Sequence, residues 1–195
     1  SPCLVGSEMC IRDSDELKEN EFAELYKEHN ENKSYLKDTQ IDTDFELLFP
    51  DSYINNIAER LNLYTELNEI KSEEELLSYE KRLIDRFGKL PPPAQDLLNS
   101  VRIKWIATNI GIEKIVMKQQ RLIGYFISDQ QSDFYQSPAF TNILQFAQSH
   151  PKTAKLKEKQ TRNGLRLLLT FENINSIDKA LSVLQPLSQK EEMSN

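Results

Sequence analysis

The chain has 195 residues, of which 38% are hydrophobic and 28% charged, and its formal net charge is −7 at pH 7. This size fits one domain with an extension, and the acidic balance argues against a primary duplex-DNA binder, because Lys and Arg neutralise phosphates in such proteins. Without a signal-peptide pattern or an apolar run near the roughly 20 residues of a membrane helix, we expect a cytoplasmic protein without membrane contact.

The charge is unevenly distributed along the chain. Residues 15–90 carry 20 acids and 10 bases, whereas residues 91–195 carry 9 acids and 13 bases. Such asymmetry is typical either of solvated helix faces or of a two-faced interaction surface. Both cysteines, Cys3 and Cys10, lie in the opening segment. The rest of the sequence therefore excludes a disulfide framework, a thiolate metal site and a cysteine nucleophile.

The first part of the chain divides into three segments. Residues 1–14 show no helical or strand period, and we interpret them as a non-native tag or scar. Residues 15–37 are polar and helix-prone with a short apolar stripe, which predicts a surface helix that continues an upstream element. Residues 41–49 alternate apolar and acidic side chains, which predicts a half-buried strand. Pro50 ends that strand, and Asp51 or Ser52 is expected to cap the next helix.

Three amphipathic helices are predicted next. Apolar spacing predicts the first over residues 52–69, with Ile57 and Leu61 among its core-facing side chains. Ser72 and Glu75 form a capping-box signature that opens the second helix. Its predicted inner stripe is Leu76, Leu83, Ile84 and Phe87, and Gly88 suits the residue after its end. The prolines at 91–93 start the third helix, which is expected to stop at Gly111 and to bury Trp105.

The pattern then changes to strands. Strands are predicted over residues 112–118, 121–128, 154–161 and 165–171, and helices over 138–149 and from Asn175 or Ser176. Asn163 and Gly164 are predicted to form a two-residue hairpin turn. The expected fold class is α+β, with an N-terminal helical half followed by an antiparallel sheet flanked by helices, all within residues 40–190.

No pattern in the sequence indicates catalysis or a bound cofactor. The five glycines form neither the GxxxxGK(S/T) nor the GxGxxG phosphate-binding motif. The two histidines, His29 and His150, lie far apart in the sequence. The acidic run at residues 73–75 falls in a first helical turn, where carboxylates complement the helix dipole. We therefore expect no catalytic residue, no metal site and no cofactor in this chain.

Two charged sets remain as candidate binding residues. Glu80, Arg82, Asp85 and Arg86 flank the predicted apolar stripe of the second helix. They form either ordinary surface ion pairs, such as Arg82 with Asp85, or a charged patch that a docked partner would desolvate. Lys155, Lys157 and Lys159 lie on one face of a predicted strand. They either protect an edge strand from aggregation or contact phosphates or an acidic partner.

The chain resembles the C-terminal (TRCF) domain of the bacterial transcription-repair coupling factor. The resemblance is dense over residues 40–115 and rests on an ordered set of short matches. These are Leu48-Phe49-Pro50-Asp51, Tyr53-Ile54, Arg60-Leu61 with Tyr64, Glu74-Glu75-Leu76, Leu83-Ile84-Asp85-Arg86-Phe87-Gly88, Leu90-Pro91 and Gly111-Ile112. By the same resemblance, residues 15–39 correspond to the linker helix that follows the family's motor region.

The resemblance implies a non-catalytic regulatory module. Full-length proteins of the family are ATP-driven DNA translocases that act on stalled RNA polymerase in nucleotide excision repair and recruit UvrA. Their C-terminal domain docks on the UvrA-binding domain and masks it, and ATP serves only the motor domains. Carried over, the docking residues are Arg82, Asp85 and Arg86. Arg82 departs from the family, in which an acidic residue is usual. Either the polarity of the ion pair is exchanged with the partner surface, or Glu80 takes over the acidic role. The alternative is an accessory nucleic-acid-binding module that uses the basic hairpin 152–166.

Overall fold

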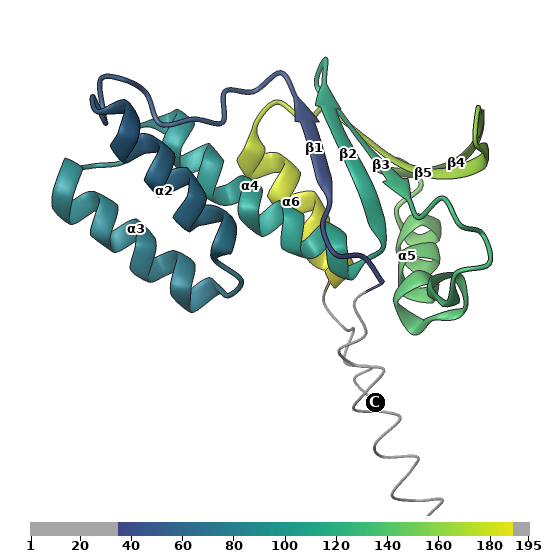
Figure 1. Cartoon of the computed structure of the whole chain (residues 1–195). Helices are drawn as coiled ribbons and strands as arrows, with labels where there is room; N and C mark the ends of the chain where they lie inside the picture. The colour runs from purple at the N-terminus through teal and green to yellow at the C-terminus, as the bar shows by residue number, and fades with distance from the viewer. Residues whose placement is uncertain (1–34, 189–195) are drawn as a thin grey trace, which may run out of the picture. The chain divides into compact units, whose positions relative to one another are not determined.

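The computed structural model describes residues 35–188 (Figure 1). The predicted tag at 1–14 and nearly all of the predicted linker helix at 15–39 lie outside the described residues. In chain order the elements are β1 (Gln40–Thr43), α2 (Ile57–Glu69), α3 (Glu73–Phe87), α4 (Pro92–Asn109), β2 (Ile112–Lys118), β3 (Arg121–Phe126), the 3-10 helix η1 (Asp133–Gln136), α5 (Pro138–Ser149), β4 (Ala154–Thr161), β5 (Gly164–Glu172) and α6 (Ile177–Ser188). The predicted α+β class is confirmed.

The sheet is mixed, which corrects the prediction of an antiparallel sheet. Its strand order is β1-β2-β3-β5-β4, and the four later strands pair antiparallel. β1 pairs parallel with β2, with Gln40 opposite Lys114. A parallel partner needs a long crossover connection, and here that connection consists of α2, α3 and α4. The helical half is therefore inserted between two neighbouring strands of one sheet.

β1 is shorter than the strand predicted over residues 41–49. The backbone N–H of Asp44 still donates to the carbonyl of Met117 (3.2 Å), and after it the chain leaves the sheet. Phe45 and Leu47 nevertheless pack against the sheet's core, as the alternation predicts. Phe49 belongs instead to the core of the helices, so this segment connects the two hydrophobic clusters.

The helices α2, α3 and α4 share one hydrophobic cluster. Its fully buried members include Leu76, Tyr79, Leu83 and Leu98, and Trp105 packs against it, as predicted. Three predicted core residues are wrong: Ile57 and Leu61 on α2 are 65% and 60% exposed, and Ile84 on α3 is 43% exposed. The predicted N-cap of α2 is also wrong. Asn56, and not Asp51 or Ser52, accepts a hydrogen bond from the N–H of Glu59 (3.1 Å).

The second cluster lies between the sheet and α4, α5 and α6. Figure 1 shows α4 and α6 side by side against the sheet and α5 near β4 and β5. Its sheet residues, such as Ile115, Met117 and Leu169, alternate with residues on the opposite face. Ser176 caps α6 by accepting from the N–H of Lys179 (3.1 Å), which confirms one of the two predicted start positions.

Two hairpin turns connect the antiparallel strands. Gln119 and Gln120 both take positive φ (54° and 58°), the combination that a two-residue type I′ turn requires. In the second hairpin Thr161 pairs with Gly164, so the turn residues are Arg162 and Asn163. The predicted Asn163-Gly164 turn is thus displaced by one position, because Gly164 (φ +113°) serves as the first strand residue.

Candidate protein-interaction site on helix α3

Local interactions fix the start and end of α3. Ser72 accepts from the N–H of Glu75 (3.3 Å), and the Glu75 carboxylate accepts from the N–H of Lys71 (3.0 Å). The predicted capping signature is thus realised one residue further back than the usual reciprocal pair. At the other end Gly88 has φ +86°, and its N–H donates to the carbonyl of Ile84 (2.9 Å). These contacts define the helix that carries all four predicted interaction residues.

The two arginines of the predicted site face α2. Arg82 forms an ion pair with Glu66, and Arg86 forms one with Glu59. The structure therefore pairs Arg82 across the two helices and not with Asp85. These pairs are largely exposed, so each contributes at most about 1 kcal/mol to stability. Their effect is to orient both guanidinium groups along the boundary between α2 and α3.

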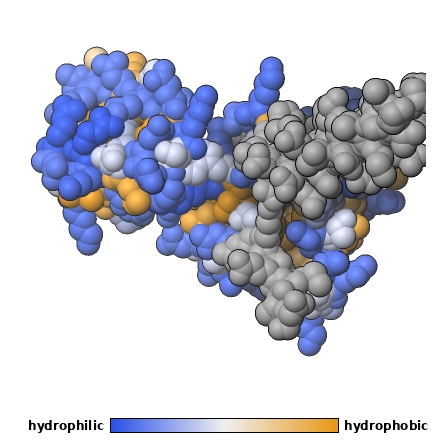
Figure 2. Space-filling view, turned by 90° about the horizontal axis from the view of Figure 1, so that it is seen from below, coloured by the Kyte–Doolittle hydropathy of each residue, from blue (hydrophilic) through white to orange (hydrophobic). Residues whose placement is uncertain are grey.

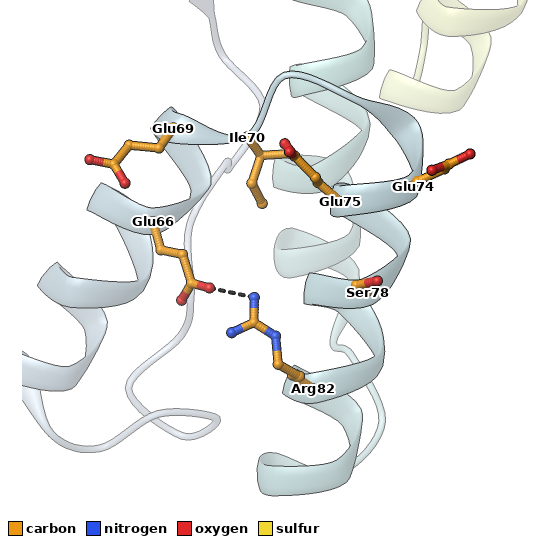
Figure 3. A pocket seen from close by; sticks show the side chains of 7 residues that line it. All are labelled: Glu66, Glu69, Ile70, Glu74, Glu75, Ser78 and Arg82. Atoms are coloured by element: carbon orange, nitrogen blue, oxygen red, sulfur yellow. Dashed lines mark hydrogen bonds and ion pairs between the residues drawn. The ribbon is translucent and has the colours of Figure 1, made fainter.

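An acidic groove follows the same boundary (Figure 3). It is open, has a volume of about 480 Å³, and is lined by Glu66, Glu69, Ile70, Glu74, Glu75, Ser78 and Arg82. The ion pair between Arg82 and Glu66 crosses it, whereas Glu74 points away from α2. Only one of its five charged side chains is basic, so the groove presents negative potential.

The outer face of α3 carries exposed apolar side chains. Leu77 is 53% exposed and Ile84 is 43% exposed, and their spacing of seven residues places them on the same face of the helix. Glu80 lies along one side of this pair in the helical arrangement, and Asp85 lies along the other. Neither acid forms an ion pair with any residue in the range 35–188. We call Leu77, Glu80, Ile84 and Asp85 the α3 outer strip.

Apart from the exposed Ile57 and Leu61 on α2, the rest of the surface around α2 and α3 is mostly hydrophilic. In Figure 2 the helical end at the left is mostly blue, with isolated orange patches between charged side chains. Large exposed aliphatic side chains flanked by charges are typical of sites that another protein covers. The sequence pattern missed Leu77, and it assigned Ile84 to the core. The predicted set is therefore divided: Glu80 and Asp85 belong to the outer strip, and Arg82 and Arg86 lie along α2.

Tyr79 holds α3 against α2 from inside. Its side chain is buried, and its hydroxyl donates to the carbonyl of Leu63 on α2 (2.7 Å). Burial is the main cause that raises the pKa of the Tyr79 phenol well above its ordinary value of 10.0, and the nearby Glu66 carboxylate adds to it. The neutral phenol is therefore the form that the folded α2–α3 pair requires.

This burial predicts a loss of stability at alkaline pH. Above the ordinary value of 10.0 the unfolded chain releases the Tyr79 proton while the folded chain keeps it, so the unfolded state binds fewer protons and the free energy of unfolding falls as pH rises. Urea denaturation between pH 8 and pH 11 should show this fall. Tyr79→Phe should have a shallower fall, and an identical slope in both proteins would contradict the assignment to Tyr79.

The three predicted lysines lie on β4, an edge strand of the sheet. Lys155 forms an ion pair with Glu172 (3.3 Å), whereas Lys157 and Lys159 are exposed and form no ion pair with residues 35–188. Their common face of the strand is as predicted. Lysines on an exposed edge strand also discourage pairing with other chains.

The described part of the chain offers neither a metal cluster nor a membrane span. Within residues 35–188, no group of three or more His, Cys, Asp or Glu side chains could hold a metal ion. Across the same residues, no helix has both the length and the apolar character needed to cross a membrane.

Comparisons with known proteins agree with this geometry. Residues 43–137 match the TRCF domain family. The transcription-repair-coupling factor of Escherichia coli (strain K12) is 38% identical over 77 residues, which cover 40% of this chain and 7% of that protein. The transcription-repair-coupling factor of Rickettsia prowazekii (strain Madrid E) is 27% identical over 193 residues, which cover 93% of this chain and 16% of that protein. The chain thus spans a small part of these relatives.

A solved structure supports the fold. The crystal structure of a C-terminal domain of transcription-repair coupling factor aligns with a TM-score of 0.58 at 19% identity, covering 80% of this chain and 93% of that one. The chain therefore has the α+β fold of that domain. The family match, the curated relatives and the solved structure all point to the TRCF domain, the C-terminal domain of transcription-repair coupling factors.

Proposed function

We propose that this chain is the non-catalytic regulatory domain of a transcription-repair coupling factor, and that it docks on the UvrA-binding domain of the same protein and masks it. The full-length protein would be a cytoplasmic, ATP-driven DNA translocase that acts on stalled RNA polymerase in nucleotide excision repair. ATP would serve the motor domains alone, and this domain would need no cofactor. Contacts with UvrA, RNA polymerase and DNA would be indirect, through the full-length protein.

The α3 outer strip is the observation that carries this proposal. A docked partner would bury the exposed Leu77 and Ile84 side chains, which supplies the apolar centre that a specific interface needs. The carboxylates of Glu80 and Asp85 flank that centre and form no ion pair with residues 35–188, so a basic partner surface would complement them. Arg82 and Arg86 would act from the side, through their ion pairs with α2.

The expected result is that changes in the outer strip weaken docking. Leu77→Ser with Ile84→Ser should raise the dissociation constant for the isolated UvrA-binding domain at least about tenfold, or 1.4 kcal/mol. Asp85→Lys should weaken binding further at low salt, because it replaces an attractive charge by a repulsive one. Calorimetric titration of the whole 195-residue chain measures both effects.

A matched control is available on the neighbouring helix. Ile57→Ser with Leu61→Ser removes two aliphatic side chains from α2 that are even more exposed (65% and 60%), and it should leave binding unchanged. Circular dichroism must show both double variants to be folded. If the α2 pair abolishes binding and the α3 pair does not, the interface lies on α2. If neither pair changes the affinity, docking does not use this helical layer.

The nucleic-acid-binding alternative has less support from the geometry. Of the basic side chains in the hairpin 152–166, Lys155 and Arg166 are already paired with Glu172 and Glu113. This leaves four for phosphates: Lys152, Lys157, Lys159 and Arg162. Each neutralised phosphate makes the dependence of the binding constant on salt concentration steeper. So few contacts would give binding that moderate salt weakens strongly, so a titration with single-stranded DNA at low and at moderate salt separates this alternative from protein docking.

A further inference from the structure

The face of the sheet opposite the helices is the second surface of interest. Side chains alternate across the strands, and the core face carries the members of the hydrophobic cluster under α4, α5 and α6. The register places a different set on the opposite face. We call this set the open sheet face: Asp42, Lys114, Val116, Lys118, Arg121, Ile123, Tyr125, Lys155, Lys157, Lys159, Arg166, Leu168, Thr170 and Glu172.

The centre of the open sheet face is apolar. Val116, Ile123 and Leu168 occupy consecutive strands there, and Tyr125 lies opposite Leu168 in the register. None of these four side chains belongs to, or packs against, either hydrophobic cluster of residues 35–188. The helices that contact the sheet lie on its core face (Figure 1). Val116, Ile123 and Tyr125 are half-buried, and Leu168 is 7% exposed.

Cations surround this centre. The open sheet face carries seven basic side chains but only two acids of its own, and Glu113 at the β2 bulge adds a third. Three ion pairs form: Lys118 with Asp42 (2.8 Å), Lys155 with Glu172 (3.3 Å), and Arg166 with Glu113. Arg121, Lys157 and Lys159 have no acidic partner among residues 35–188. The face therefore keeps a net positive charge on an acidic chain.

The aromatic content of this face decides between two kinds of partner. Its one ring, Tyr125, lies under the Arg166 guanidinium at 5.5 Å. Single-stranded nucleic acids bind through several aromatic rings on which bases stack, and here the only ring is already covered. Branched aliphatic side chains inside a polar rim are typical of protein interfaces. The Arg166 guanidinium is itself held in place by its ion pair with Glu113, so the ring it covers is not free for a base.

We propose that the open sheet face is a docking site for an acidic, amphipathic protein segment. The apolar side of that segment would cover Val116, Ile123 and Leu168, and its carboxylates would meet Lys157, Lys159 and Arg121. This surface lies on different elements from α3, so the inference does not depend on the docking proposed above. It gives the domain two interaction surfaces of opposite charge.

A peptide titration of the whole chain tests this proposal. The probe is a synthetic helix of about 20 residues with leucines along one face and glutamates elsewhere, followed by fluorescence anisotropy in about 50 mM salt. Two further probes accompany it: the same peptide with glutamine in place of glutamate, and single-stranded oligothymidine. We expect the acidic peptide to bind and the other two to bind at least tenfold more weakly.

Charge-reversal variants locate the contact. Lys157→Glu with Lys159→Glu should weaken binding of the acidic peptide at least tenfold. Lys152→Glu with Lys179→Glu changes the net charge equally at exposed positions off this face and should leave binding unchanged. Equal losses in both variants would reduce the effect to net charge and overturn the proposal. Tighter binding of oligothymidine, lost in the first variant only, would overturn it in favour of a nucleic-acid site.

Discussion

Gly111→Ala is expected to lower the free energy of unfolding by about 3–4 kcal/mol, because the new methyl group meets both backbone strain and a buried ring. Gly111 takes φ +73°, a region that side chains with a Cβ rarely adopt. A Cβ there would lie 2.4–2.7 Å from three ring atoms of Phe134. That ring is fully buried and stacks on Phe126 with centroids 6.0 Å apart, so it has little room to move.

Gly88→Ala is the matched control for this prediction. Gly88 also has positive φ (+86°), but a Cβ added at this residue would meet nothing within 4 Å. Its substitution should therefore cost only the backbone strain, about 1–3 kcal/mol. Urea denaturation of the two variants and the parent chain gives both values. Equal losses at the two glycines would mean that the Phe134 ring moves aside without cost.

Tyr79→Ala is expected to cost about 3–5 kcal/mol, the range for deleting a large buried aromatic side chain. Tyr79 is among the largest fully buried side chains, and it lies in the cluster shared by α2, α3 and α4. Deleting it leaves a cavity between α2 and α3 and removes the hydrogen bond to the Leu63 carbonyl. The thermal midpoint should fall accordingly, and the α3 outer strip should lose its fixed position.

Tyr79→Phe separates the two contributions. The phenylalanine keeps the packing and removes only the hydroxyl, so its expected cost is about 1 kcal/mol. A loss as large as that of Tyr79→Ala would show that the hydrogen bond to Leu63, and not the volume of the ring, holds α2 and α3 together. Both variants are compared by denaturant midpoints at pH 7, where the phenol is neutral in either state.

Local signals made most element boundaries predictable. Ser72, Gly88 and Gly111 act on the few residues around them, so their effects on helix ends can be read from the sequence. The same reasoning failed for Ile57, Leu61 and Ile84. The helices α2 and α3 each carry more apolar side chains than a single neighbouring helix can bury. Which of these side chains become buried depends on where the other helices pack.

Long-range features of the candidate site were also beyond the sequence pattern. The alternation in residues 41–49 predicts a strand but contains no information about its partner, and β1 pairs parallel with a strand beyond three helices. Similarly, the sequence places Arg82 within reach of Asp85, while the structure pairs it with Glu66 from another helix. Spacing along one helix identifies neighbours on that helix only.

The position of β1 has a consequence for how this domain folds. Its partner β2 follows α2, α3 and α4 in the sequence, so pairing the two strands closes a long loop. The entropy cost of closing that loop offsets the free energy of pairing until the three helices are compact. The helical cluster and the β2–β3 hairpin have mostly local contacts and can form earlier. With only four residues on an outer edge of the sheet, β1 is also the strand that opens with the smallest loss of contacts. β1 is therefore expected to be the last strand of the sheet to form during folding and the first to separate during unfolding.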